Sequence, residues 1–392
     1  MPFGRILVDI AECRLFQMPF AFFIIFLVSM NCAIAQSDIA QIELQTITHD
    51  KQRTFEGFTL YPASPQSSVF LFDPHGTSVH RWKVKTVRAK LLPDCTLLAI
   101  EDEALKLFDW SGTVLRKIGA EGEIHHDFEV TPSGSILFLV KKNLQLLPRS
   151  EEIPFPEKKR KYRSDLIRET TQTGEILWEW HFEEGIDPFS CGAKPCPKNA
   201  EDILWIHKVR DWTHANTIRV LPDNKWYRGG DERFRPGNLI TMARNLWQGF
   251  IIDKQTKKVV WSYSGDYRGG LMFPHDAHMV PEGLPGAGNI LIFDNGDSKR
   301  GSIALEVNPV TNEVLWKYEN GRKFFSNGHG ALMRLPNGNT LLSEDFRDRI
   351  LEVTPSEEVV WRVKGPPGLR RATKYPMNYC KQFSQLQPSK SG

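Results

Sequence analysis

One segment occurs six times along this chain of 392 residues, and this repetition constrains the fold more than any other feature. Each copy contains a short apolar strand, a turn that resembles Leu-Pro-x-Gly-Asn, a second apolar strand, and a polar turn followed by apolar residues that usually end in Trp. The polar-turn halves span residues 73–82, 109–115, 171–178, 253–261, 308–316 and 354–361. A period of about 40 to 60 residues built from short strands is typical of β-propellers. We therefore predict an all-β fold, a six-bladed β-propeller.

The composition argues against several other classes of protein. Charged residues make up 25% of the chain and hydrophobic residues 41%, which are ordinary values for a globular protein and indicate neither disorder nor a coiled coil. The formal net charge of +3 is small and evenly spread. We therefore expect no nucleic-acid partner.

The N-terminus has the pattern of a signal peptide. Arg5 and Arg14 precede an apolar stretch at 18–30, and Ala33-Ile34-Ala35 is a cleavage site of the A-x-A type. We predict that residues 1–35 are removed near Ala35, that the protein is periplasmic or secreted, and that the mature chain has no stable membrane insertion. The alternative is an uncleaved anchor, for which the apolar stretch is short.

Two cysteines lie close together in a loop that contains Gly and Pro. The segment Cys191-Gly-Ala-Lys-Pro-Cys196 predicts a local Cys191–Cys196 disulfide in an oxidising compartment. A metal site is the alternative, but no second pair with suitable spacing accompanies it. Cys95 occupies the place that a turn glycine has in other repeats, and we interpret it as an ordinary turn residue.

After the signal peptide, the repeats divide the chain into three parts. Residues 36–53 contain a strand that we expect to pair with the last blade and close the ring. We expect residues 54–364 to form the six-bladed propeller and to be the catalytic domain. The tail at 365–392 has no strand pattern, and we expect it to wrap the outside of the domain or to be disordered.

Four of the repeats have a histidine six to eight residues before the turn proline: His126, His214, His275 and His329. In a propeller, the first strand of each blade lines the central channel. Each of these histidines opens such a strand. A single histidine at a strand start is usually a turn or cap residue, whereas four in a similar register indicate a site. We therefore predict that all four lie at one end of the channel.

Arg244 can be placed by the same kind of counting. It lies seven residues after the turn glycine of its repeat, at the place that Asn295 and Asp345 occupy in the next two repeats. A hairpin of this length returns to its starting end, so we expect Arg244 beside His214. Asn216 lies two residues after His214, on the same face of the strand.

Several histidines together with one arginine suit chemistry on an oxyanion. The guanidinium fork matches a tetrahedral oxyanion such as sulfate or phosphate. A neutral histidine can attack such a group and form a covalent intermediate, and a second histidine can act as general acid and base. His278, three residues after His275, faces either the channel or the neighbouring blade, so the nucleophile stays open between these two.

Four motifs carry a resemblance to the bacterial arylsulfate sulfotransferase family, over about residues 55–365. They are His125-His126-Asp127, Asp211-Trp212-Thr213-His214-Ala215-Asn216, Met242-Ala243-Arg244-Asn245 and Pro274-His275-Asp276-Ala277. The resemblance implies a periplasmic six-bladed propeller. It also implies transfer of a sulfuryl group from a phenolic sulfate donor to a phenol acceptor through a sulfohistidine, with no nucleotide donor and no cofactor.

The resemblance also implies roles for individual residues. His275 would be the nucleophile and Arg244 the sulfate clamp, while His214 and Asn216 would hold sulfate and phenolic oxygens. The expected catalytic set is therefore His275, His214, Arg244 and His126, and the expected substrate-binding set is Asn216, His329 and His278. The chain lacks the N-terminal β-sandwich to which dimerisation is tied in the best-known members of the family, so its oligomeric state stays open.

Two other functions stay open at this point. The segment from Thr171 to Trp178 resembles the Trp-docking repeat of quinoproteins, which usually have eight blades, so a quinoprotein-like binding propeller is one alternative. A non-catalytic binding propeller is another. Neutral imidazoles at one channel mouth also suit zinc or copper.

Overall fold

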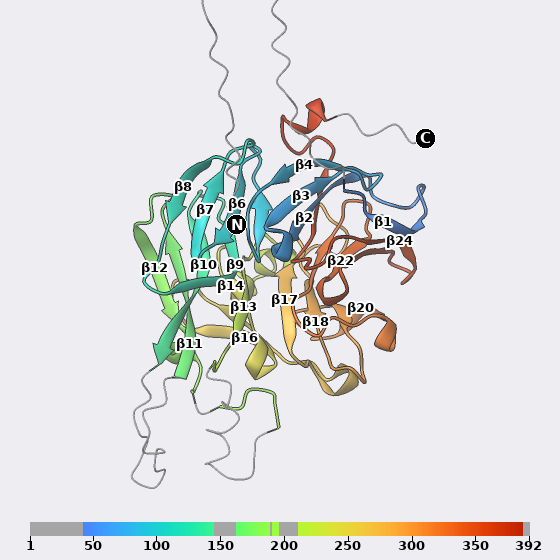
Figure 1. Cartoon of the computed structure of the whole chain (residues 1–392). Helices are drawn as coiled ribbons and strands as arrows, with labels where there is room; N and C mark the ends of the chain where they lie inside the picture. The colour runs from blue at the N-terminus through green and yellow to red at the C-terminus, as the bar shows by residue number, and fades with distance from the viewer. Residues whose placement is uncertain (1–41, 145–161, 189, 196–210, 387–392) are drawn as a thin grey trace, which may run out of the picture. The chain divides into compact units, whose positions relative to one another are not determined.

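The computed structural model describes residues 42–144, 162–188, 190–195 and 211–386, and their regular structure is mostly β-strand. The strands form six antiparallel sheets, which are the blades of a propeller (Figure 1). The predicted six-bladed fold is confirmed. The proposed signal peptide lies outside the described residues. None of the helices that the structure describes is long and apolar enough to span a membrane.

Blades one to three come from the first half of the chain, apart from one strand. Blade one contains β2 (Gly57–Ala63), β3 (Ser68–Phe72), β4 (Ser78–Trp82) and β25 (Thr373–Pro376). Blade two contains β5 (Ala89–Leu91), β6 (Leu97–Glu101), β7 (Ala104–Phe108) and β8 (Val114–Ile118). Blade three contains β9 (Glu123–Val130), β10 (Ile136–Leu144), β11 (Tyr162–Thr170) and β12 (Ile176–His181).

Blades four to six follow in the second half. Blade four contains β13 (Ala215–Val220), β14 (Leu239–Ala243), β15 (Gln248–Ile252) and β16 (Val259–Tyr263). Blade five contains β17 (Pro274–Met279), β18 (Ile290–Asp294), β19 (Ile303–Val307) and β20 (Val314–Glu319). Blade six contains β21 (Ala331–Arg334), β22 (Thr340–Glu344), β23 (Arg349–Val353), β24 (Val359–Lys364) and, as a fifth strand, β1 (Gln45–His49).

The helical elements are short and lie in connections. The α-helices are α1 (Phe182–Gly185) and α3 (Lys225–Arg228), and single 3₁₀ turns are η1 (Ser64–Gln66), η2 (Glu232–Phe234), η3 (Arg244–Leu246), η4 (Tyr267–Gly269), η5 (Gly321–Lys323), η6 (Asp345–Arg347) and η7 (Phe383–Gln385). In blades one, four and six, a 3₁₀ turn joins the second and third strands counted from the channel. The turn of blade four therefore places Arg244 next to the channel.

The tryptophan of the repeat is the residue that joins one blade to the next. In blades one, three and four its indole N–H donates to a backbone carbonyl of the following blade: Trp82 to Asp109 at 3.1 Å, Trp178 to Lys254 at 3.0 Å, and Trp261 to Pro309 at 2.8 Å. A buried tryptophan combines a large apolar area with a hydrogen-bond donor that needs a partner. The carbonyls belong to the polar turns of the repeat, which explains why the turn and the Trp recur together.

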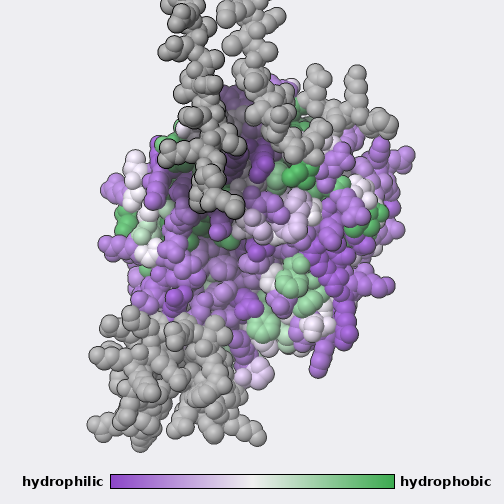
Figure 2. Space-filling model, in the orientation of Figure 1, coloured by the Kyte–Doolittle hydropathy of each residue, from purple (hydrophilic) through white to green (hydrophobic). Residues whose placement is uncertain are grey.

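Six apolar clusters within the described residues fill the spaces between neighbouring blades. The cluster around Phe58, Trp82 and Leu97 lies between blades one and two, and the cluster around Tyr61, Phe72 and Trp361 lies between blades six and one. The other four clusters fill the remaining spaces in turn. The face seen in Figure 2 is mostly hydrophilic, with small separate hydrophobic areas outside the grey atoms. Burial between blades is therefore the main apolar contribution to the fold.

Both ends of the propeller chain close the ring. β1 pairs with β24 of the last blade, and Leu44 N–H donates to Gly76 O of blade one at 2.8 Å. At the other end, β25 pairs with β2 and becomes the inner strand of blade one. In Figure 1 the red C-terminal segment accordingly runs beside the blue strands of blade one.

The expectation that residues 365–392 contain no strand was wrong. β25 is only four residues long, and Lys374 within it is buried against Glu352 at 3.0 Å. A strand that faces a channel filled with charges lacks the apolar alternation by which half-buried strands are identified. This explains why the sequence pattern missed it.

A disulfide joins the C-terminal segment to blade two. Cys95 is bonded to Cys380 across 285 residues of sequence. Cys95 has a φ of 68°, in keeping with its place in a turn, but the interpretation as an ordinary turn residue was wrong. Cys191 is also disulfide-bonded. Its predicted partner Cys196 lies outside the described residues, so that pairing stays a prediction.

The Cys95–Cys380 cross-link should contribute strongly to stability. Replacing both residues by serine is expected to lower the free energy of unfolding by about 2 to 5 kcal/mol, because a cross-link over a long loop restricts the unfolded chain. Denaturant unfolding followed by tryptophan fluorescence measures this. The double variant under reducing conditions is the matched control, since it isolates the contribution of the Cys191 disulfide. A double variant as stable as the oxidised wild type would contradict the prediction.

Candidate active site

Four histidines from four consecutive blades lie together where their inner strands begin. The ring centroids are 4.7 Å apart for His126 and His214, 6.2 Å for His126 and His275, and 5.6 Å for His275 and His329. The inner strands β9, β13, β17 and β21 contact one another around the axis. Each histidine lies in or just before one of these strands. The structure thus brings together the four histidines selected from the sequence.

Irregular backbone, rather than one common register, turns these side chains toward each other. Register shifts in β9, β13 and β17 add residues opposite the partner strand, at positions that include His126, Asn216 and His275. His126, His214 and His329 have φ angles of 55°, 46° and 57°, which are uncommon for residues with a side chain. β-Bulges of this kind re-aim side chains and are frequent next to active sites.

The protonation pattern of His275 is set by its neighbours. Its Nδ1 lies 2.8 Å from Asn295 Oδ1. The amide group of Asn295 donates to Ser326 O and His329 O, both at 2.7 Å, so its Oδ1 can only accept a hydrogen bond from His275. The Nδ1–H tautomer follows, and the lone pair of His275 is on Nε2.

The environment of His275 also keeps the ring neutral. The side chain is 3% exposed, and burial, with the positive charge of Arg371 and the neighbouring His329, holds the pKa of His275 well below its usual range. Nε2 accepts a hydrogen bond from the His329 backbone N–H at 3.1 Å. His275 is therefore a neutral imidazole whose Nε2 lone pair is covered by a backbone amide.

His214 has a carboxylate partner that the sequence analysis did not single out. Its Nδ1 donates to Asp211 Oδ2 at 2.8 Å, so its Nε2 is the ring nitrogen left to take or give a proton. Asp211 O in turn accepts from the Asn245 amide at 2.7 Å. A histidine oriented by a carboxylate in this way is suited to general acid and base catalysis.

His126 is connected to a second carboxylate through His125. The Nδ1 atoms of the two histidines are 2.6 Å apart, and His125 Nε2 lies 2.9 Å from Asp165 Oδ1. Asp165 is fully buried and also accepts from Thr213 Oγ1 at 2.5 Å. If Asp165 binds the Nε2 proton of His125, His126 must donate through Nδ1 and carries its lone pair on Nε2. Burial, with the neighbouring His125, holds the pKa of His126 well below its usual range.

Arg244 is placed beside His214 and at the edge of a cavity. Its backbone N–H donates to His214 O at 3.3 Å, and its guanidinium lies over the Phe273 ring at 4.7 Å. Nη1 donates to Asn245 Oδ1 at 3.1 Å. No Asp or Glu among the described residues forms a salt bridge with Arg244. Its positive charge is therefore available to an anion.

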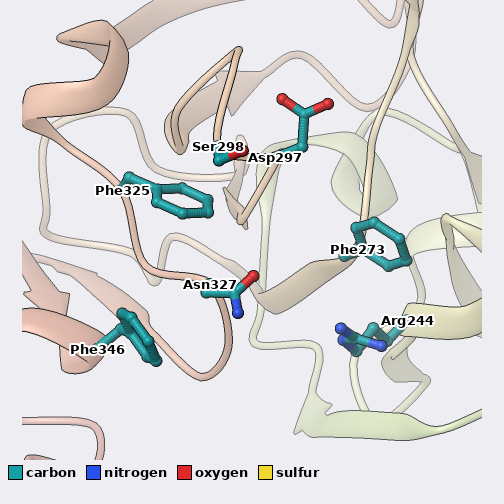
Figure 3. A pocket seen from close by; sticks show the side chains of 8 residues that line it. Arg244, Phe273, Asp297, Ser298, Phe325, Asn327 and Phe346 are labelled. Carbon is teal, nitrogen blue, oxygen red and sulfur yellow. The ribbon is translucent and has the colours of Figure 1, made fainter.

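The cavity beside Arg244 has a volume of about 460 Å³, and its lining combines three phenylalanines with Arg244, Gly296, Asp297, Ser298 and Asn327. Figure 3 shows Phe273 above Arg244, with Phe325, Phe346 and Asn327 on the opposite side. Phe346 is 62% exposed, so its ring is accessible to a ligand in this cavity. A cavity with aromatic walls and one unpaired guanidinium suits a planar aromatic anion.

Two predicted residues have other contacts than expected. Asn216 is buried, and its amide donates to Pro274 O at 3.2 Å, so it joins β13 to β17; its role toward substrate stays a prediction. His278 lies three residues beyond His275 on β17, and Asp276, Arg219, Glu129 and Lys90 are the charged groups that act on it. His278 is not among the histidines whose rings contact His275.

Sequence reasoning missed three residues of the site: Asp211, Asn295 and Arg371. Asp211 stands in the quoted motif three residues before His214, and Asn295 occupies the place of Arg244 in its own repeat, so both had a signal that could have been followed. Arg371 lies in the tail for which no structure was expected. Among the described residues, no group of three or more His, Cys, Asp or Glu side chains is arranged to hold a metal ion.

Comparisons with known proteins agree with the fold and point to one family. Residues 104–365 match the family model described as arylsulfotransferase (ASST). A search of curated proteins finds no match.

Among solved structures, a protein of unknown function from Bacteroides caccae is similar, with a TM-score of 0.52 and 14% identity over 82% of this chain and 99% of that chain. A streptogramin B lyase has a TM-score of 0.45 and 11% identity, over 84% of this chain and 85% of that chain. At 14% identity, the likeness to the first of these shows the fold alone.

The buried histidines should make the stability of the protein depend on pH. Burial, with the charges of Arg370 and Arg371, lowers the pKa of His329 to about 3, whereas an unfolded histidine titrates near about 6.5. Between these values the unfolded chain binds a proton that the folded chain does not. This histidine therefore lowers the free energy of unfolding as the pH falls, by up to about 1.4 kcal/mol per pH unit.

His329→Asn is expected to reduce the dependence of the free energy of unfolding on pH by the contribution of this histidine. Denaturant unfolding between about pH 4.5 and 6.5 measures that dependence. The control is His75→Asn, because His75 lies exposed in a turn of blade one. If the free energy of unfolding of His329→Asn depended on pH as strongly as that of the wild type, the prediction would be wrong.

Proposed function

The chain belongs to the arylsulfotransferase family, and on this premise we propose that it moves a sulfuryl group from a phenolic sulfate ester to a phenolic acceptor through a sulfohistidine. The observation that carries the proposal is that Arg244, which has no salt bridge among the described residues, lines a cavity with three phenylalanines and lies beside the group of histidines. That group includes a neutral histidine, His275, and a histidine with a carboxylate partner, His214.

His275 is the proposed nucleophile. Direct attack by a phenol on an aryl sulfate is slow, because the negative sulfate oxygens repel the nucleophile and phenolate leaves poorly without help. A neutral imidazole avoids that repulsion and divides the transfer into two displacements. The Nε2 lone pair would form the N–S bond while the S–O bond to the phenol breaks. The position of His278 among buried charges favours His275 over His278 for this role.

Asn295 supports this role by holding the proton on Nδ1 of His275. The ring would then be cationic while it carries the sulfuryl group. A cationic imidazole leaves more easily than a neutral one would, which suits the second displacement. The His329 N–H that covers Nε2 has to move aside for attack, and a sulfuryl oxygen on Nε2 would then lie within its reach.

Arg244 and His214 would supply the other two functions of the reaction. The Arg244 fork would bind the non-bridging oxygens, on which charge is concentrated in both transition states. His214 Nε2 would give a proton to the departing phenolate and later take one from the acceptor, with Asp211 stabilising the charged ring. His126 lines a second cavity of about 320 Å³ with His329 and Arg371, and it would assist at the sulfuryl group from there.

The substrates would be small aromatic molecules. The rings of Phe273, Phe325 and Phe346 around the cavity match a phenyl group, and Arg244 in the same lining would bind the sulfate. Such a site needs neither a nucleotide donor nor a cofactor. The Cys95–Cys380 disulfide is typical of an oxidising compartment, which supports a periplasmic or secreted location.

Replacing the nucleophile should abolish both turnover and the covalent intermediate. The wild type incubated with an aryl sulfate is expected to gain the mass of one sulfuryl group, measured on the intact protein at neutral pH, and to follow ping-pong kinetics. His275→Ala should show neither. His278→Ala is the comparison variant: if it lost the mass gain while His275→Ala kept it, the nucleophile would be three residues away. If neither variant mattered, the mechanism would be wrong.

Replacing Arg244 should test the anion site independently of the nucleophile. Arg244→Lys is expected to lower kcat/KM by about 100-fold or more, because one ammonium cannot reproduce the bidentate fork. The matched control is Arg228→Lys, an exposed arginine of the same blade that pairs with Glu282 and should keep full activity. Equal kcat/KM in Arg244→Lys and the wild type would show that this arginine does not bind the transferred group.

A further inference from the structure

A group of buried charges fills the channel next to the histidines. Asp127 and Asp276 follow His126 and His275 directly in sequence and are 0% and 1% exposed. The guanidinium groups around them come from three blades: Arg88 Nε lies 2.8 Å from Asp127, Arg371 Nη1 lies 3.3 Å from Asp127, and Arg219 Nη2 lies 3.4 Å from Asp276. Charges buried this deeply need partners on all sides. One of the three arginines contacts the backbone of the histidine site as well as the carboxylates.

Arg371 is that residue. Its Nη2 donates to two backbone carbonyls, those of Asn216 and His275, the latter at 3.1 Å. Its own backbone N–H donates to Asp345 Oδ2 at 2.9 Å, and its φ is 50°. The side chain is 3% exposed. Arg371 thereby ties the C-terminal segment to β13, to β17 and to η6.

We propose that Arg371 is a positioning residue for the sulfuryl-transfer site: it holds the bulges that carry Asn216 and His275 in place and supplies a fixed positive charge behind the histidines. The inference rests on the proposed function for its kinetic consequence, but its structural consequence can be measured without turnover.

The geometric part of the argument concerns the bulged backbone. A bulge leaves residues outside the regular ladder of hydrogen bonds, so the carbonyls of Asn216 and His275 need other donors. Nη2 of Arg371 donates to both, and Thr217 Oγ1 also donates to the His275 carbonyl at 2.8 Å. Arg371 is the group that joins the two carbonyls and thereby fixes them relative to each other. A displacement of about 1 Å at a reacting group can cost on the order of 100-fold in rate. Loss of this fork should therefore reduce kcat more than substrate binding.

The electrostatic part concerns the charge of the histidines. The charged and titratable groups that face His275 are Arg371, Arg244, His126, His214 and His329. Arg371 has the largest effect among them, and it also lowers the pKa of His126 and His329. A positive charge fixed at this place disfavours protonation of the nucleophile, so its lone pair stays available at neutral pH.

The position of Arg371 depends on the C-terminal segment. β25 follows two residues after it, and Cys380 then bonds this segment to Cys95 of blade two. The same segment that completes blade one thus delivers the arginine to the site. A strand that served only to close the ring would not need a guanidinium aimed at two carbonyls of blades four and five.

Two variants separate the geometric and electrostatic contributions. Arg371→Gln removes the charge and the fork, and should lower kcat about 10- to 100-fold. It should also move the titration of the His275 imidazole to higher pH, because a positive charge that disfavours protonation has been removed. Arg371→Lys keeps the charge and loses the fork, so it should lower kcat while the titration of His275 stays near that of the wild type. Nuclear magnetic resonance of labelled histidine measures the titration, and steady-state kinetics with an aryl sulfate measures kcat.

The control is Lys374→Met, in the same C-terminal strand. Lys374 is as buried as Arg371 and pairs with Glu352, which lies in β23 away from the histidines. This variant should lower the stability of the strand, but it should leave kcat per folded molecule and the His275 titration unchanged. Thermal unfolding of all variants gives the folded fraction.

The outcomes show whether Arg371 positions the site or only stabilises the fold. If Arg371→Gln loses activity only in proportion to its unfolded fraction, as Lys374→Met would, and His275 titrates as in the wild type, the proposal is overturned. If Arg371→Gln does not fold, Arg371→Lys decides: a lowered kcat in the folded variant supports the proposal, and a wild-type kcat overturns it. If the wild type has no sulfotransferase activity, the proposed function fails, while the His275 titration still tests the role of Arg371.

Discussion

The whole molecule depends on closing the ring between its first and last blades. Blade one receives only three strands from the N-terminal part of the chain, so without β25 the strand β2 would have an unpaired edge toward the channel. Unpaired strand edges are poorly tolerated in β-proteins. Pairing of β2 with β25, the contact of β1 with β24 and the disulfide to blade two remove that edge. The channel, and with it the site, has a defined shape because the ring is closed.

The site exists because regular structure is interrupted at the channel. Bulges in β9, β13 and β17 and left-handed residues before β13 and β21 bring the histidines into contact. Each ring then has a fixed neighbour: Asn295 for His275, Asp211 for His214, and His125 for His126. These neighbours differ in charge, so chemically equal side chains acquire different roles. Burial next to fixed arginines keeps the rings of His126 and His275 neutral, which a nucleophilic imidazole requires.

The blades could be predicted from the sequence because the polar turn recurs in every blade and a Trp follows it in every blade except the second. In blades one, three and four this Trp donates to the polar turn of the next blade. The channel histidines and Arg244 were found for a similar reason, since position along a hairpin determines which end of the channel a residue reaches.

The remaining features depend on contacts between distant segments, which leave no local pattern. Nothing near Cys95 indicates that its partner is Cys380, and Lys374 and Arg371 look like residues of a solvated tail because their partners are charges contributed by other blades. For Asp211 and Asn295, the sequence repeats indicated positions near the channel. The repeats did not indicate that these two residues hydrogen-bond to histidines.

The placement of the last strand has a consequence for how the protein is made. Ribosomes synthesise β25 after every other strand, and residues 371–380 contribute a strand, a cross-link and a charge at the channel. A chain that stops before this point has an open first blade and an incomplete site at once. Truncated copies should therefore lack a complete site and be easily degraded, so that only chains synthesised through the C-terminus form the closed ring.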